Sequence, residues 1–180
     1  NTITLTSVAA TSAQTLCNNN SAITNINYAT TTATGASFSG FPAGVVTSWS
    51  GNVVTISGTP TTAGTYSYTV TTSGGCVNTS LTGTINIREL PVIQLSVVGD
   101  GCLDKTSLIA TTGLTTYAWY KDNAIINGVA SGTYTPSLSG VYKVQVSDGV
   151  CSNTSTTTTI STCGLTAEGK TMPTATSTTL

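Results

Sequence analysis

Two twelve-residue stretches of the chain, residues 59–70 and 135–146, align without a gap at an offset of 76 residues. Each begins with Thr-Pro, continues to a Gly followed two residues later by a Tyr, and ends in Val. A Trp precedes each stretch and a Cys follows it. Repetition at a fixed offset indicates repeated structural units. The sequence therefore predicts two related domains, and the pattern within the repeat decides their class.

That pattern is the alternation of apolar and polar residues that is typical of β-strands. Apolar and polar residues alternate over residues 2–8 and 65–70, as they do in half-buried strands. Residues 45–49 and 53–56 flank Ser50-Gly51-Asn52, which favours a tight hairpin turn. Turn signals recur every 8 to 12 residues, and no segment shows a sustained helical period. The sequence therefore predicts an all-β protein built from two antiparallel β-sandwich domains.

A change in composition marks the boundary between the domains. The first charged side chains of the chain stand in Arg88-Glu89-Leu90-Pro91, and a proline cannot donate a hydrogen bond to a sheet. We expect a first sandwich over residues 1–88, a second over residues 89–163, and a Thr-rich tail over residues 164–180. The chain begins at Asn1 without a Met, and we interpret it as a mature form or a fragment.

Charge is scarce and excludes several classes of partner. Charged residues make up 6% of the 180 residues, against about 25% in an ordinary domain. The net charge of −1 provides no basic field for nucleic acid or anionic lipid, and no apolar run is long enough to span a membrane. The 41 threonines suit pleated strands that face water without charge. A folded chain with a neutral, polar surface is expected.

Catalytic and metal-binding residues are hard to assemble from this composition. The chain has no His, which excludes Ser-His and Cys-His nucleophile systems. Glu89 lies in the linker and Glu168 in the tail, so they do not suit a facing pair of carboxylates. Asp100 and Asp104 could help to hold Ca²⁺, but turn formation is the commoner role for Asp in loops. We expect no enzyme activity, cofactor or metal.

Four of the five cysteines stand at equivalent places in the two repeats: Cys17, Cys76, Cys102 and Cys151. No two cysteines are closer than 12 residues, which disfavours zinc, whose sites use close ligand pairs. Disulfides and an oxidising, extracellular location are expected instead. Cys163 is the odd cysteine, and it is a free thiol, the start of a further domain or an inter-subunit disulfide.

The motifs of both repeats resemble those of one family. Tyr117-Ala-Trp-Tyr-Lys-Asp-Asn, Tyr134-Thr-Pro and Ser139-Gly-Val-Tyr-Lys-Val are similar to immunoglobulin-like repeats of bacterial surface proteins. In the first repeat, Phe41-Pro-Ala-Gly and Val54-Thr-Ile-Ser-Gly-Thr-Pro resemble the putative-Ig relatives of those repeats. The resemblance covers about residues 1–163. It implies the tandem immunoglobulin-like modules of Bacteroidota-type secreted surface proteins and adhesins, which serve as spacers, adhesins and enzyme appendages alike.

Three aromatic residues fit the resemblance. Trp119 stands where the core of such a sandwich contains one large aromatic residue. Tyr66 and Tyr142, each two residues after a Gly, stand where a tyrosine-corner hydroxyl reaches the backbone upstream.

The cysteines depart from the inter-sheet bridge of antibody domains. Cys17 and Cys102 precede the second strand of their repeats, and Cys76 and Cys151 lie in the last hairpin turn. We therefore expect two disulfides across the ends of the sandwiches, Cys17–Cys76 and Cys102–Cys151.

Two functions follow from these expectations. The first is a non-enzymatic extracellular structural protein, a subunit or repeat segment of a bacterial surface filament or adhesin that associates with itself or with neighbouring repeats. The second is a carbohydrate-binding or spacer module of a secreted multidomain enzyme. Exposed aromatic residues would favour glycan binding, and the candidates are Phe41, Trp49, Tyr117 and Tyr120, although packing in the fold is the commoner role of such residues.

Contact with a neighbouring subunit is expected at one end of the chain. The tail, or the N-terminal strand over residues 2–8, would add to a sheet of that subunit.

Overall fold

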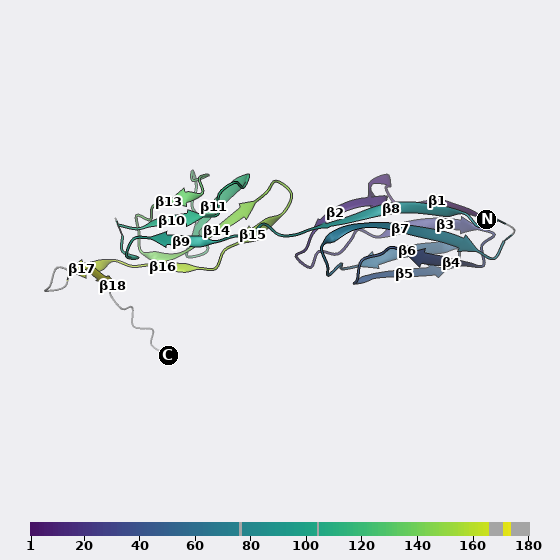
Figure 1. Cartoon of the computed structure of the whole chain (residues 1–180), viewed down its shortest axis with the longest axis horizontal. Coiled ribbons are helices and arrows are strands. Elements are labelled where there is room, and N and C mark those ends of the chain that lie inside the picture. Colours follow the sequence, from purple (N-terminus) through teal and green to yellow (C-terminus); the bar gives the residue numbers. More distant parts are fainter. Residues whose placement is uncertain (76, 104, 166–170, 174–180) are drawn as a thin grey trace, which may run out of the picture. The chain divides into compact units, whose positions relative to one another are not determined.

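The computed structural model describes residues 1–75, 77–103, 105–165 and 171–173, and for residues 164, 165 and 171–173 it describes the backbone only. Strands dominate throughout, and the one helical element in the described residues is the short 3₁₀ turn η1 (Ala9–Ser12). The chain divides into two compact units, Asn1–Leu90 and Pro91–Leu180 (Figure 1). The prediction of an all-β protein is confirmed.

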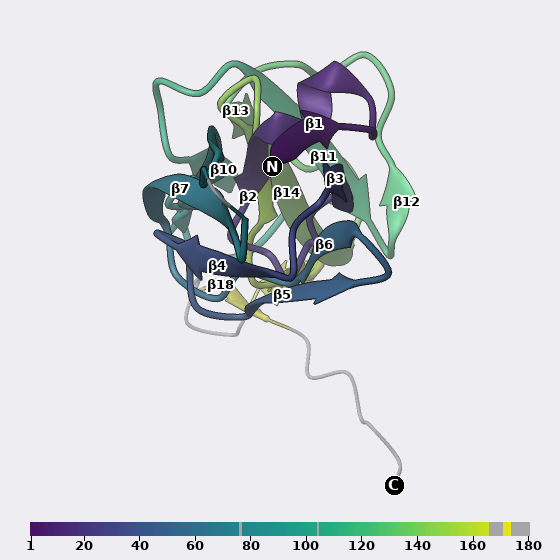
Figure 2. The ribbon, with the colours of Figure 1, turned by 90° about the vertical axis from the view of Figure 1, so that its right-hand side faces the viewer.

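The first unit is a sandwich of two four-stranded sheets, with strand orders β1-β3-β6-β5 and β2-β8-β7-β4 (Figure 2). Its strands are β1 (Thr2–Leu5), β2 (Ala13–Cys17), β3 (Ile26–Thr31), β4 (Gly35–Ser39), β5 (Val45–Ser50), β6 (Val53–Gly58), β7 (Gly64–Ser73) and β8 (Ser80–Arg88). All neighbours are antiparallel except β2 and β8. The predicted hairpin joins β5 to β6 through Gly51 and Asn52, whose φ angles of 56° and 65° are those of a two-residue hairpin turn.

The core of this unit lies between the inward faces of its two sheets. It comprises Ile3, Ile23, Ile26, Tyr28, Val54, Ile56, Tyr68, Val70, Ile85 and Ile87. The hydroxyls of Tyr28 and Tyr68, one from each sheet, lie 2.8 Å apart in a buried hydrogen bond. Gly83 stands opposite Tyr68, and a Cβ there would lie 2.2 Å from the Tyr68 hydroxyl, so only glycine leaves room for this ring. The two tyrosines thus join the sheets at the centre of the core.

The second unit has a three-stranded sheet of order β13-β10-β9 and a larger sheet of order β12-β11-β14-β15, in which β16 also pairs with β14. Its strands are β9 (Leu95–Val98), β10 (Ser107–Ala110), β11 (Thr116–Lys121), β12 (Ala124–Ile125), β13 (Thr133–Tyr134), β14 (Gly140–Ser147), β15 (Ser152–Thr154) and β16 (Thr158–Ile160). Two further strands, β17 (Cys163–Leu165) and β18 (Thr171–Pro173), pair with each other.

Trp119 occupies the centre of the second core, as the resemblance implies. Its side chain is fully buried, and its indole N–H donates to the carbonyl oxygen of Ser131 at 2.8 Å. The ring of Tyr134 lies between those of Trp119 and Tyr142, with centroid distances of 5.6 and 5.7 Å. Leu108 and Val144 complete the packing from β10 and β14.

Both predicted tyrosine corners are present. Tyr142 donates its hydroxyl hydrogen to the carbonyl oxygen of Leu138 at 2.6 Å, and Tyr66 donates to that of Thr62 at 3.3 Å. Each bond spans four residues and holds the loop before the strand against the strand itself. The corners differ in burial, because Tyr142 is fully buried and Tyr66 is partly exposed.

The addition of the N-terminal strand to a neighbouring subunit stays a prediction, and within its own chain this strand lies at one edge of a sheet. Strand β1 pairs with β3 of its own chain, from Thr2 opposite Thr31 to Leu5 opposite Tyr28. It is shorter than predicted because the chain turns into η1 after it. The tail prediction is only partly within the described residues, where β17 pairs with β18. Within the described residues, no helix has the length and hydropathy of a membrane span.

The two corners give a matched test of this hydrogen bond. We expect Tyr142→Phe to lower the free energy of unfolding by about 1 kcal/mol, because a short, part-buried hydrogen bond is lost. Tyr66→Phe should cost less than half of that, because its bond is longer and water replaces it. Guanidinium unfolding of both variants measures the difference, and equal losses would contradict the assignment.

High pH should destabilise the protein through its buried tyrosines. Burial is the main cause that raises the pKa of Tyr142 to about 12, followed by the nearby Tyr134. Burial, and then the hydrogen bond to Tyr28, raise the pKa of Tyr68 further. An unfolded tyrosine ionises near pH 10, so the stability from Tyr142 is complete below about pH 10 and is lost as pH rises through about 12. A spectrophotometric tyrosine titration with parallel unfolding curves checks this, and a single titration near pH 10 with no loss of stability would refute it.

Candidate functional site

The outward face of the sheet β2-β8-β7-β4 carries hydroxyl side chains in register, and we call it the hydroxyl face. Alternate residues of two adjacent strands form it: Thr65, Ser67, Thr69, Thr71 and Ser73 on β7, and Ser80, Thr82, Thr84 and Asn86 on β8. The register sets them directly opposite each other in four cross-strand pairs, from Thr65 with Asn86 to Thr71 with Ser80. The inward neighbours on the same strands fill the core, so the alternation places the hydroxyl groups outward.

Hydrogen bonds link the hydroxyl groups within this face. The oxygens of Thr71 and Ser80 lie 2.8 Å apart, and Thr65 donates to the amide oxygen of Asn86 at 3.3 Å. No charged side chain occurs before Arg88. From Thr65 to Ser73 on β7 and from Ser80 to Asn86 on β8, the face can therefore donate and accept hydrogen bonds through neutral groups, and the one charge on these two outward rows is Arg88 at the end of β8. Such chemistry suits contact with another neutral polar surface.

The aromatic candidates of the first unit serve its packing. Trp49 packs partly against the core, and its indole N–H donates to the hydroxyl of Thr30 at 3.0 Å. Phe41 stacks on Tyr68, with the ring centroids 4.7 Å apart. Neither ring lies free on the surface.

The aromatic candidates of the second unit also have partners within the fold. The Tyr117 hydroxyl donates to the carbonyl oxygen of Thr111 at 3.0 Å and accepts from the N–H of Leu114 at 3.2 Å. Tyr120 lies on the outward face of β11 beneath the ammonium group of Lys143, which is 5.6 Å from its ring centroid. In the described part of the chain, the four aromatic candidates form no flat exposed row for a sugar chain.

Most of the polar contacts around Lys143 hold a hairpin in place. Its ammonium group donates to the amide oxygen of Asn123 at 2.8 Å. The carboxylate of Asp122 accepts from the N–H of Val141 at 2.9 Å and pairs with Lys121. The Lys121 bond first, and the Val141 N–H second, lower the pKa of Asp122. These contacts fasten the β11–β12 turn to β14, beside a hollow of about 310 Å³.

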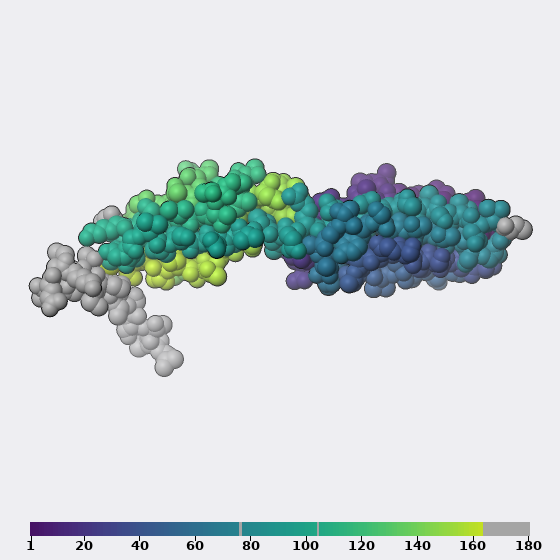
Figure 3. Space-filling view, viewed as in Figure 1, coloured from purple at the N-terminus to yellow at the C-terminus, as the bar shows by residue number. Residues whose placement is uncertain are grey.

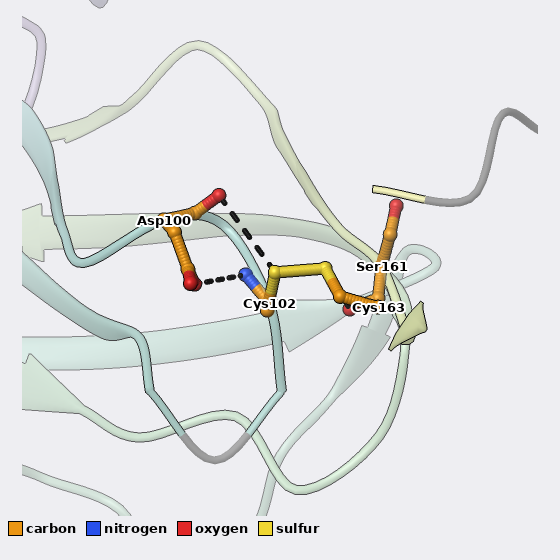
Figure 4. Close-up of a disulfide and its surroundings, with 4 residues drawn as sticks. All are labelled: Asp100, Cys102, Ser161 and Cys163. Atoms are coloured by element: carbon orange, nitrogen blue, oxygen red, sulfur yellow. Dashed lines mark hydrogen bonds between the residues drawn. A yellow bond between two sulfur atoms is a disulfide. The ribbon is translucent and has the colours of Figure 1, made fainter. Parts of the chain in front are cut away.

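A disulfide joins Cys102 to Cys163 in the second unit, with their Cα atoms 5.4 Å apart (Figure 4). The N–H of Cys102 donates to the Asp100 carboxylate at 3.0 Å, so Asp100 forms a turn. Backbone bonds from Leu103 to Ser161 and from Ser161 to Gly101 bring the two segments together. The bond thus fixes the chain after β16 to the loop between β9 and β10.

The predicted pair Cys102–Cys151 is wrong, and so is the interpretation of Cys163 as a free or inter-subunit thiol. The reason is the direction of β14. Its first residue, Gly140, pairs with Ile160 near Cys102, whereas Cys151 follows its last residue, Ser147. The two cysteines therefore lie at opposite ends of an eight-residue strand.

The predicted pair Cys17–Cys76 includes a residue outside the described ranges, Cys76. Cys17 and Cys151 are each disulfide-bonded.

The described residues contain no group of three or more His, Cys, Asp or Glu side chains that could hold a metal ion. Of the two aspartates considered for Ca²⁺, Asp100 caps the turn before Cys102, and Asp104 lies outside the described residues.

Sequence reasoning missed the hydroxyl face and the pairing of Cys163. The face was detectable, because hydroxyl residues recur at every second position from Thr65 to Ser73 and from Ser80 to Thr84. Their register across the two strands was not detectable, because it depends on the turn that joins them. The pairing of Cys163 depends on the strand directions in the sheet, which cysteine spacing does not reveal.

Comparison with known proteins agrees on the fold. An I-band fragment of titin matches with a TM-score of 0.51 and 14% identity, covering 84% of this chain and 62% of the titin chain. An E-to-A variant of a three-Ig titin structure matches with a TM-score of 0.51 and 13% identity, covering 84% of this chain and 63% of that one. The adhesin InvE of Yersinia pseudotuberculosis matches at a TM-score of 0.36 and 14% identity over 88% of this chain and 58% of its own, a score too low for an argument.

The chain thus spans less than two thirds of the titin chains it resembles. No family model matches the sequence, and no curated protein does. With its all-β sheets, the titin likeness shows that the chain has an immunoglobulin-like fold.

Removing the Cys102–Cys163 bond should destabilise the second unit. The bond closes a loop of 61 residues, so replacing both cysteines with serine should lower the free energy of unfolding by roughly 4 kcal/mol in the chain-entropy model. Guanidinium unfolding measures the loss, and peptide mapping without reductant identifies the pair. A peptide that links Cys102 to Cys151, or a double variant as stable as the parent, would contradict the assignment.

Proposed function

We propose that this chain is a non-enzymatic extracellular structural protein, a subunit or repeat segment of a bacterial surface filament or adhesin. The motif resemblance to immunoglobulin-like modules of Bacteroidota-type secreted surface proteins supports this proposal. Its function would lie in the shape and surface of the sandwiches, through contacts with further copies or with neighbouring repeats of a longer chain.

The hydroxyl face is the observation that carries this proposal. Nine outward positions on two adjacent strands hold Ser, Thr or Asn, Arg88 ends the outward row of β8, and the first 87 residues include no charged side chain. Ordinary domains carry about one charged residue in four, which keeps them apart in solution. A neutral sandwich has little electrostatic repulsion from its own copies. The surface therefore favours repeated contact between like units over recognition of a charged ligand.

The disulfides support a location outside the cytoplasm. Cys102 and Cys163 are paired, and Cys17 and Cys151 are disulfide-bonded as well. Such bonds persist in oxidising compartments and are rare in the cytosol. Durability of this kind suits a surface protein that is not renewed after secretion.

The alternative is a carbohydrate-binding or spacer module of a secreted multidomain enzyme. A glycan-binding module would need exposed aromatic rings. Phe41 and Trp49, however, pack against the first core, and the Tyr117 hydroxyl donates a hydrogen bond to the backbone of its own loop. Tyr120 is the candidate that faces outward, and it lies under Lys143. Glycans therefore remain a secondary partner in this proposal.

Electron microscopy of the purified protein tests the proposal. We expect fibres or regular oligomers at high protein concentration, and light scattering should show a mass that rises with concentration. The same preparation should show no binding on a glycan array. Uniform monomers that bind a polysaccharide would contradict the structural function and favour the alternative.

A further inference from the structure

Strand β5 forms an open edge of the first unit. It is the last strand in the order β1-β3-β6-β5, and no described strand pairs with its outer side. Figure 2 shows it outside β6, and the blue segment that contains it follows the lower margin of the unit in Figure 3. Edge strands present unpaired backbone groups and readily accept another strand.

The usual protections of an edge strand are missing from β5. Proteins protect edges with charged residues, prolines, bulges or short strands. With six residues, β5 is the longest edge strand of the described sheets, and it contains neither charge nor proline. All six residues pair with β6 in continuous register, so there is no bulge. By contrast, the edge strands β12 and β13 have two residues each.

The register shows which way the backbone groups of β5 point. The carbonyl oxygen of Gly58 on β6 accepts from Ile23, on the side away from β5, and Gly58 lies opposite Val45. Opposite residues of antiparallel strands alternate between pairs that exchange both hydrogen bonds and pairs that exchange none. Val45 and Gly58 therefore form a non-bonded pair.

It follows that Val46 and Ser48 bond to β6, whereas the N–H and C=O groups of Thr47 and Trp49 point away from the sheet. No hydrogen bond from these outward groups to another described residue is present. Val46, next to them, is 63% exposed. The edge therefore combines unpaired backbone groups with an exposed apolar side chain.

We propose that β5 is a self-association edge, which pairs antiparallel with β5 of a second copy and places Thr47 opposite Thr47. In that register the two Thr47 residues exchange both N–H···O=C bonds, and each Trp49 lies opposite the Val45 of the other copy. The two four-stranded sheets would join into one eight-stranded sheet.

A second copy is the occupant that the edge fits. A strand paired antiparallel with its own copy is self-complementary, as a two-fold contact requires. The absence of charged side chains before Arg88 removes repulsion between copies and offers no counter-charge to a charged partner. This inference rests on the proposed self-association and names its surface. Because a two-fold contact closes on two copies, a filament requires another contact elsewhere.

Sedimentation equilibrium of the full chain tests the edge with two variants and one control. Thr47→Pro removes an outward N–H and no bond to β6, and Ser48→Lys places a charge on the exposed side of the edge. The control, Thr4→Lys, puts the same charge on β1, an exposed position at the opposite edge of the same sheet. Unfolding curves establish that each variant is folded, and Ser48→Lys carries the test if Thr47→Pro is not.

We expect dimers of the parent chain and of Thr4→Lys, and at least an approximately tenfold higher dissociation constant for the β5 variants, which is ~1.4 kcal/mol. Equal dissociation constants for Ser48→Lys and Thr4→Lys would contradict pairing through β5. Self-association would then use another surface. A parent chain that stays monomeric up to about 1 mM would overturn both proposals. Dimers sensitive to Ser48→Lys, without fibres in electron microscopy, would support the edge and count against the filament.

Discussion

The alternation of side chains along the strands is the constraint on which this structure depends. On β7, Tyr68 and Val70 enter the core, while Thr69 and Thr71 face outward. A shift of one residue in the pairing would place hydroxyl groups in the core and apolar groups in water. Burial of the inward set is the main favourable term in folding, and the hydrogen bond between Tyr28 and Tyr68 adds a specific link between the two sheets.

The same alternation determines the surface. Since the first unit has no charged side chain before Arg88 and many of its outward positions carry Ser, Thr or Asn, its faces are hydrated with little electrostatic repulsion. Charged side chains usually protect open strands from pairing with other chains. In β5 this protection is absent along six residues that hold a continuous register. A neutral surface and an unprotected edge are thus two consequences of the missing charged residues, and both favour contact between copies.

Local patterns in the sequence predicted the architecture well, because alternation and turn residues act over a few positions. The all-β class and the hairpin around Gly51 follow from such patterns, whereas the buried Trp119 and both tyrosine corners were implied by the resemblance to immunoglobulin-like repeats. The disulfide of Cys102 followed from neither, because its partner depends on which end of β14 each cysteine reaches. Spacing favoured Cys151, but the antiparallel direction of β14 and β16 brings Cys163 to Cys102.

The open edge was also beyond sequence reasoning. Residues 45–49 were recognised as a strand, but alternation does not show whether a strand lies at the centre or the edge of its sheet. Strand order is set by packing between segments far apart in the chain, such as the pairing of β1 with β3 on the other side of the same sheet. The hydroxyl face also depends on strand pairing, since its side chains stand opposite each other only when β7 and β8 are in register.

Amide hydrogen exchange along β5, followed by NMR, tests the register and the open edge most directly. In dilute monomer, the amides of Val46 and Ser48 should be protected by β6, while those of Thr47 and Trp49 should exchange far faster. At high concentration, the amide of Thr47 should become protected as a second copy pairs with it. Uniform protection along β5 in the monomer, or no change at Thr47 with concentration, would contradict the account.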